Sequence, residues 1–177
     1  MAEVVNRKRL FFAIWPGSKV RERLARSRSL YCPRIGRWVA AENLHITLVF
    51  LGNVEVPRIE SIETVSSQVH MKRFEITLDR MHAASRKGMV WLAPCVVPKE
   101  LQELAAELKV VLAGLNVKVE ERDYRPHVTI IRNLPVRIET REIEPVRWPV
   151  DSFALIESRH LHGASVYSPV RSWPLLV

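Results

Sequence analysis

Two short stretches of the chain carry the residue types from which a proton-transfer site can be built. His45 and Thr47 lie in one run of large apolar residues, and His127 and Thr129 lie in another. Side chains alternate between the two faces of a β-strand, so each histidine shares a face with its threonine. A polar pair on an otherwise apolar strand needs hydrogen-bond partners or a water-filled cleft. Because the pattern occurs twice, we interpret both stretches as strands that line one site.

The two histidines suit general acid–base catalysis, since the unperturbed pKa of imidazole is about 6.5. One can take a proton from water while the other gives a proton to a leaving oxygen. The threonine hydroxyls can donate hydrogen bonds to an anion such as a phosphate. Arg125 would share the face of His127 if the strand extended through Pro126, and would then add a phosphate contact. The alternative for Arg125 is a solvated side chain at the end of the strand.

Other kinds of site fit the sequence less well. There is no serine or cysteine nucleophile signature, no glycine-rich phosphate loop and no HExxH motif. Two histidines without a clear third ligand make a poor zinc site. Cys32 and Cys95 are far apart and lack metal-ligand spacing. The residues therefore favour a site without a metal ion.

Length and composition describe a globular protein with a basic surface. The 177 residues are 47% hydrophobic and carry a net charge of +8. We expect one domain over residues 1–177, with residues 1–8 as a frayed N-terminal extension. The charge favours RNA, DNA or phosphorylated small molecules as ligands. The basic segment from Lys19 to Arg37 is either an RNA-contacting patch or a solvated helix face.

The cysteines and the apolar segments indicate in which cellular compartment the protein is expected. Two separate cysteines favour a reduced, cytoplasmic protein. The apolar run 10–15 is too short for a signal peptide, and no stretch approaches the length of a membrane span. We expect a cytoplasmic monomer that does not enter the membrane.

Hydrophobic periodicity predicts the elements that position the motifs. Besides the two motif strands, we expect strands at 10–15, 37–39, 74–79, 88–93, 150–158 and 164–173. Helices are expected from Ser18, as N-cap, to about 29, over 58–70 and over 98–114. The segment 133–149 is rich in proline and charge and reads as a loop.

The order of these elements repeats. In each half, an apolar strand leads through a helix to a motif strand, and a further alternating strand follows. Two half-domains related by a pseudo-two-fold axis would bring both motif strands to a central cleft. Phe11 and Phe12 lie on opposite faces of the first strand, so one of them would line that cleft. The other histidines (His70, His82, His160 and His162) are expected to lie outside the site, and the tryptophans at 38, 91, 148 and 173 to pack in the core.

At these residues the chain resembles the two-histidine phosphoesterase superfamily, whose paired HxTx motifs end in an apolar residue. His45–Leu48 and His127–Ile130 match the two motifs. Further segments resemble the bacterial and archaeal RNA 2′,3′-cyclic phosphodiesterases, also called 2′-5′ RNA ligases. These segments are Arg9–Ala13, Arg37–Val39, Glu42–His45, Phe50–Gly52, Arg125–Thr129 and Leu155–Ser158.

The resemblance implies a bilobal α+β fold, with two pseudo-symmetric antiparallel-sheet lobes, outer helices and a central cleft. It implies hydrolysis of a terminal 2′,3′-cyclic phosphate to a 2′-phosphate without metal or nucleotide cofactor, with 2′-5′ ligation as the reverse type of chemistry. If the roles of the family's motif residues apply here, His45 is the proton donor and His127 the proton acceptor, and Thr47 and Thr129 hold the phosphate. The symmetry of the motifs leaves the donor and acceptor interchangeable.

The partner implied is RNA with a cyclic phosphate end, tRNA fragments included. Two alternatives remain open from the residues. One is a phosphodiesterase for a small cyclic nucleotide or a 2′-5′ oligonucleotide, and the other is a non-catalytic RNA-binding module of the same fold.

Overall fold

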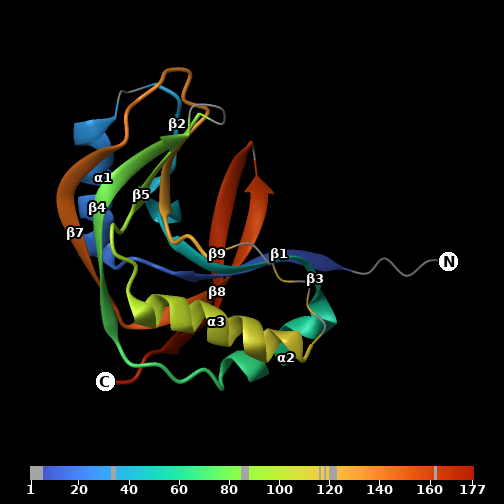
Figure 1. The fold of residues 1–177 in the computed structure, drawn as a ribbon. Helices are drawn as coiled ribbons and strands as arrows, with labels where there is room; N and C mark the ends of the chain where they lie inside the picture. The colour runs from blue at the N-terminus through green and yellow to red at the C-terminus, as the bar shows by residue number, and fades with distance from the viewer. Residues whose placement is uncertain are drawn as a thin grey trace.

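The computed structural model describes residues 6–32, 35–84, 88–115, 117, 119, 123–161 and 163–177. These residues form two antiparallel sheets with helices on their outer sides, which confirms the expected α+β class (Figure 1). No helix in the described part of the chain is both long and apolar enough to cross a bilayer.

The first sheet has the strand order β3-β1-β8-β9. Its strands are β1 (Arg7–Ile14), β3 (Ile46–Glu55), β8 (Ser152–Leu161) and β9 (Ala164–Pro174). The second sheet has the order β2-β6-β5-β4-β7. Its strands are β2 (Arg37–Trp38), β4 (Phe74–Ala84), β5 (Met89–Ala93), β6 (Val128–Arg132) and β7 (Arg141–Val150).

The two sheets share a pattern that follows from the repeat in the sequence. The motif strand β3 pairs with β1, and the motif strand β6 pairs with β5. The next strands outward are β8 and β9 in the first sheet, and β4 and β7 in the second. Two strands thus exchange between the sheets. β4, which follows the first motif strand, lies in the sheet of the second motif, and β8, which comes after β6 and β7, lies in the sheet of the first motif.

The helices cross over in the same way. α1 (Ser18–Tyr31) follows β1 of the first sheet but contacts β7 of the second, and α3 (Lys99–Ala113) follows β5 of the second sheet but contacts β3 of the first (Figure 1). α2 (Ile59–Ser66) packs on α3. The apolar stripe of α3, which includes Leu101, Leu104 and Leu108, is completely buried. Burial of this stripe fastens α3 to the sheet that carries the first motif.

One predicted loop is a strand over most of its length. Residues 141–150 form β7, although the sequence placed 141–149 in the loop 133–149 and Val150 at the start of the following strand. Ile143, Val146 and Trp148 of this strand are buried. Its prolines, Pro145 and Pro149, are exposed and lie on the edge strand of the second sheet, where a residue without an N–H donor is tolerated. These prolines made the segment look like a loop although it has the apolar pattern of a strand.

Two helix ends also differ from the prediction. Gly17 is the N-cap of α1 and Ser18 is already helical, so Ser18 makes no side-chain cap. α2 ends at Ser66 instead of position 70. Ser66 and Ser67 donate their hydroxyls to the carbonyls of Ile62 and Glu63, one turn earlier, and side-chain bonds of this kind compete with helix continuation.

Candidate active site

The first motif strand carries a β-bulge directly after its threonine. Ala13 of β1 faces Thr47, but the next residue, Phe12, faces Val49, so Leu48 is an extra residue in β3. A bulge shifts the alternation of side chains by one position. The residue three places after Thr47 therefore returns to the threonine face.

The second motif strand carries the same irregularity at the same place. Trp91 of β5 faces Thr129, and the preceding residue, Val90, faces Ile131, so Ile130 is the extra residue in β6. Ile130 and Ile131 are both fully buried. The side chain three places after Thr129 is thereby turned back toward the threonine.

The two side chains that the bulges redirect are Phe50 and Arg132. Both line one cavity of about 760 Å³ together with the four motif residues His45, Thr47, His127 and Thr129. The structure thus brings both predicted motifs to a single site. Phe11 also lines this cavity, whereas Phe12 is completely buried in the core. We call this space the motif cavity.

Each motif histidine is oriented by the backbone two residues before it. His45 Nδ1 donates to the carbonyl oxygen of Asn43 at 2.7 Å, and His127 Nδ1 donates to that of Arg125 at 2.8 Å. With the proton on Nδ1, the neutral ring has its lone pair on Nε2. The Thr47 hydroxyl donates to His45 Nε2 at 3.1 Å. Each Nε2 is thus the nitrogen left to exchange a proton with a ligand.

Aromatic rings enclose His45. The indole of Trp15 is stacked on it with ring centroids 5.2 Å apart and planes 3° apart. Phe11 lies 5.0 Å away, and Tyr167 presents its ring edge-on at 5.3 Å. These contacts hold the imidazole in place and remove water from most of its surface.

The enclosure lowers the pKa of His45 to about 4, because burial disfavours the imidazolium. The hydrogen bond to Asn43 acts in the opposite direction, and the charges of His127 and Arg132 lower the pKa of His45 further. At this pKa His45 is a neutral imidazole near pH 7.

His127 has different surroundings although its motif is the same. The Trp91 ring lies 6.1 Å from it with the planes at 65°. His82 in turn stacks on Trp91 at 5.6 Å. Trp91, which the sequence placed in the core, thus joins the second motif to a third histidine.

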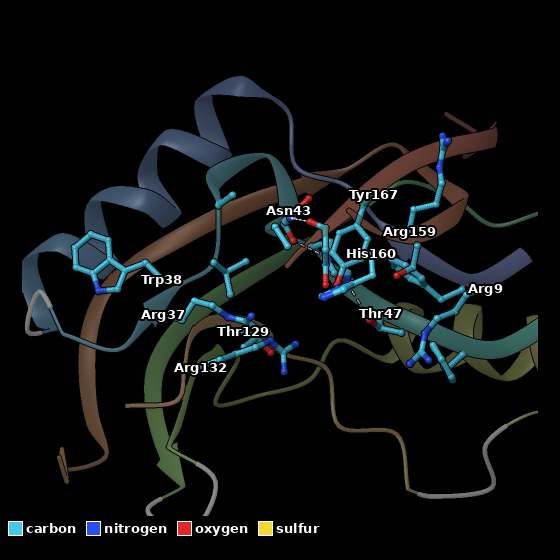
Figure 2. A pocket seen from close by; sticks show the side chains of 18 of the residues that line it. Arg9, Arg37, Trp38, Asn43, Thr47, Thr129, Arg132, Arg159, His160 and Tyr167 are labelled. Carbon is cyan, nitrogen blue, oxygen red and sulfur yellow. Dashed lines mark hydrogen bonds between the residues drawn. The ribbon is translucent and has the colours of Figure 1, made fainter. Parts of the chain in front are cut away.

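Four arginines and no aspartate or glutamate line the motif cavity, among the residues that the structure describes. Arg37 and Arg132 lie on one side, near Thr129, and Arg9 and Arg159 lie on the other (Figure 2). The Arg9 guanidinium is 4.8 Å from the centre of the Phe50 ring. A cavity of this composition favours an anionic ligand.

Arg125 lies before the start of β6, because the strand begins at Val128 and does not extend through Pro126. Its side chain is exposed and lines a neighbouring cavity of about 500 Å³, which shares Thr47 and His127 with the motif cavity. The motif cavity itself is not lined by Arg125. A phosphate contact from Arg125 stays a prediction.

Several lining residues were not predicted. His160 lines the motif cavity, against our expectation for the histidines outside the motifs, and Trp38 lines it as well. His162 lies outside the described residues. His160 faces Ser165 across the β8–β9 hairpin, and the side-chain amide of Asn43 donates to the Ser165 carbonyl at 2.8 Å. That bond fastens the hairpin to the turn η1 (Ala41–Asn43), just before the first motif.

Comparison with known proteins agrees with this geometry. Residues 16–161 match the model of the 2′-5′ RNA ligase superfamily. The RNA 2′,3′-cyclic phosphodiesterase of Escherichia coli K12 is 32% identical over 173 residues, which cover 95% of this chain and 97% of that protein. The protein of the same name from Aeropyrum pernix is 30% identical over 141 residues, covering 73% and 80%.

Solved structures give the same result. The crystal structure of Escherichia coli LigT complexed with 3′-AMP superposes with a TM-score of 0.86 at 31% identity, and the alignment covers 96% of this chain and 99% of LigT. The match spans both sheets and both motif strands. The chain therefore belongs to the 2′-5′ RNA ligase superfamily.

Proposed function

We propose that this protein is an RNA 2′,3′-cyclic phosphodiesterase that opens a terminal cyclic phosphate to a 2′-phosphate. The observation that carries the proposal is the motif cavity, where both motif histidines and both threonines lie among arginines without a lining carboxylate. Acid–base chemistry on an anion needs two proton-exchanging groups and a cationic surround, and the cavity supplies both.

In the proposed reaction, water attacks the phosphorus and the bond to the 3′-oxygen breaks. His127 takes the proton from the water, and His45 gives a proton to the departing 3′-oxygen. The Thr47 and Thr129 hydroxyls donate to the non-bridging oxygens. The products are a 2′-phosphate and a free 3′-hydroxyl, and ligation of a 5′-hydroxyl end to form a 2′-5′ linkage would use the same groups.

The low pKa of His45 makes the proton donor dependent on the ligand. At a pKa of about 4, His45 is neutral near pH 7, so the proton that it donates has to be taken up when the substrate is bound. An anionic phosphate next to Nε2 favours the imidazolium and raises the pKa of the ring. Under this proposal, substrate binding itself charges the acid.

The roles of the two histidines can be separated with a substrate that needs no acid. Hydrolysis of a nucleoside p-nitrophenyl phosphodiester releases a nitrophenolate, which leaves without a proton. His45→Ala should lose much less activity on this ester than on the cyclic phosphate, while His127→Ala should lose activity on both. The opposite pattern would exchange the donor and acceptor assignments.

The proposed activity is tested with RNA oligonucleotides that end in a 2′,3′-cyclic phosphate. The purified protein should convert them to the 2′-monoester in the presence of EDTA, identified by chromatography against 2′- and 3′-phosphate standards. The same RNA with a 3′-phosphate end is the control. Activity that EDTA removes and Zn²⁺ or Mn²⁺ restores would contradict the metal-free mechanism. Binding without turnover would favour the RNA-binding module.

We also propose that the protein acts as a cytoplasmic monomer on RNA ends such as those of tRNA fragments. Both cysteines, Cys32 and Cys95, are free thiols, as is usual in reducing compartments. Light scattering during size-exclusion chromatography checks the oligomeric state, and a mass well above 20.4 kDa would contradict it.

A further inference from the structure

A second cavity adjoins the motif cavity and reaches one of the two motif histidines. It has a volume of about 500 Å³, and Thr47, Phe50 and His127 line both cavities. His45 lines the motif cavity but is not among the described residues that line the second one. The second cavity is therefore in contact with the proposed base and not with the proposed acid.

The geometry of phosphoryl transfer gives this asymmetry a chemical meaning. The attacking and leaving oxygens lie roughly in line on opposite sides of the phosphorus. Under the proposed function, on which this inference rests, the 3′-oxygen leaves at His45 and the nucleophile approaches at His127. The second cavity thus lies on the side of the nucleophile. Hydrolysis needs room for one water molecule, whereas a cavity of about 500 Å³ is large enough for a nucleotide.

The walls of the second cavity carry the groups that a nucleotide needs. Lys109 of α3 and Arg125, which precedes β6, contribute positive charge, and Asp123 contributes one carboxylate. None of these three forms an ion pair within the part of the chain that the structure describes. Cations bind the phosphates of RNA, and a carboxylate accepts hydrogen bonds from ribose hydroxyls. Because α3 packs on β3, Lys109 is held close to the first motif strand (Figure 1).

We propose that the second cavity binds the 5′-terminal nucleotide of an acceptor RNA, and that Lys109 holds the phosphodiester that follows this nucleotide. The 5′-oxygen of the acceptor attacks the phosphorus of the cyclic phosphate and passes its proton to His127. The bond from phosphorus to the 3′-oxygen breaks, and that oxygen takes a proton from His45. The product is a 2′-5′ linkage, and no further reactant is consumed.

The experiment measures ligation and hydrolysis with the same donor, a labelled RNA that ends in a 2′,3′-cyclic phosphate. The acceptor is a dinucleoside monophosphate with a free 5′-hydroxyl, and electrophoresis gives the initial rates of both products. Lys109→Ala should raise the KM for the acceptor by roughly tenfold, the effect of losing a charge-assisted hydrogen bond. Hydrolysis of the donor without acceptor should stay unchanged, because water makes no use of the lysine.

Two control variants and a second acceptor separate charge from structure. Lys109→Arg keeps the charge and should retain most of the affinity for the acceptor. Lys99→Ala removes another lysine of α3, which is paired with Glu103 and lines neither cavity, and should change neither reaction. Adenosine has a 5′-hydroxyl but no phosphodiester, so its KM as acceptor should be the same in the wild-type protein and in Lys109→Ala.

Several results would contradict the inference. An unchanged KM for the dinucleoside acceptor in Lys109→Ala would overturn it. An equal loss of ligation and hydrolysis in this variant would do the same, since the lysine would then act on the chemistry that both reactions share. Hydrolysis by the wild-type protein without any ligation would overturn the inference while leaving the proposed function intact. Turnover of the donor by neither reaction would contradict the proposed function itself.

Discussion

At the scale of single residues, two copies of the same HxTx motif receive different environments. His45 is enclosed by Trp15, Phe11 and Tyr167, whereas among the residues that the structure describes His127 has one ring contact, with Trp91. The hydrogen bonds that orient the two rings are nearly the same. Symmetric orientation combined with asymmetric solvation is how two like groups come to carry opposite roles in proton transfer.

Replacement of either motif histidine should reduce turnover strongly. We expect His45→Ala and His127→Ala each to lower kcat on the cyclic phosphate by roughly 10² to 10⁴, the usual contribution of a general acid or base. The double variant should be little worse than the single ones, since the two groups act as a unit. Circular dichroism serves as the folding control. Near wild-type turnover in either single variant would refute the two-histidine mechanism.

The enclosed, half-buried imidazole of His45 should make stability depend on pH. Its pKa is lowered from 6.5 to about 4, so the unfolded chain binds a proton in this range that the folded protein does not. Stability should therefore be full above pH 6.5 and decrease as the pH falls toward 4. NMR titration of the His45 ring and thermal unfolding at several pH values measure the two effects.

Trp15→Ala tests whether the stacked indole is the cause of the low pKa of His45. Removal of the stacked indole admits water to the His45 ring, so the pKa of His45 should move back toward 6.5 and the pH dependence of stability should weaken. Trp15→Phe keeps an aromatic cover and should change the titration less. An unchanged His45 titration in Trp15→Ala would show that the stacked ring does not set the pKa.

At the scale of elements, irregularities decide which side chains reach the site. A strictly alternating β6 would direct Arg132 away from Thr129, and the bulge at Ile130 reverses this. The loop after β6 is held against the turn between β4 and β5, where the Leu134 N–H donates to the Gly88 carbonyl at 2.8 Å. This contact anchors the end of the strand that carries Arg132.

Substitution of Gly88 should disturb that anchor. Gly88 has a φ of +53°, and an added Cβ would lie 2.6 Å from the Leu134 carbonyl oxygen. We expect Gly88→Ala to destabilise the protein by about 1–3 kcal/mol in denaturant unfolding, because backbone strain and a backbone clash act together. Gly17→Ala is the matched control, since nothing lies within 4 Å of the added atom there. Equal stability of the two variants would argue against a close approach at Gly88.

At the scale of the whole molecule, positive charge is divided between the cavity and the outer surface. Of the basic residues in the segment from Lys19 to Arg37, Arg37 lines the motif cavity. Arg21 and Arg28 donate to the backbone carbonyls of Pro16 and Val39. Arg23 and Arg26 are exposed on α1, beside the second sheet. The exposed face of α1 can therefore contact a long ligand that extends beyond the motif cavity, whereas a mononucleotide in the cavity would not reach it.

Salt should therefore affect long and short ligands differently. Affinity for an RNA of several turns should fall steeply between low and physiological salt, whereas kcat/KM for a cyclic mononucleotide should fall much less. Binding titrations at several salt concentrations measure the slope. Arg23→Gln combined with Arg26→Gln should reduce the slope for RNA if α1 contacts the strand. A flat response of the wild-type protein would assign α1 to a merely solvated face.

The sequence alone determined the two motif strands and the pairs His45–Thr47 and His127–Thr129. These follow from local rules, because alternation along a strand can be recognised in neighbouring residues. The α+β class came from the resemblance of the motifs to a known family. The strand β7 was missed because prolines at a sheet edge look like a loop until the edge is known.

Only the tertiary structure decided which elements meet. The exchange of β4 and β8 between the sheets, the gathering of four arginines around one cavity and the enclosure of His45 depend on contacts between residues far apart in the chain. The register of the strands was also decided by the tertiary structure, since one bulged residue moves Arg132 from the core face to the site. Desolvation and register are properties of packed neighbours, so no local pattern around His45 or Arg132 contains them.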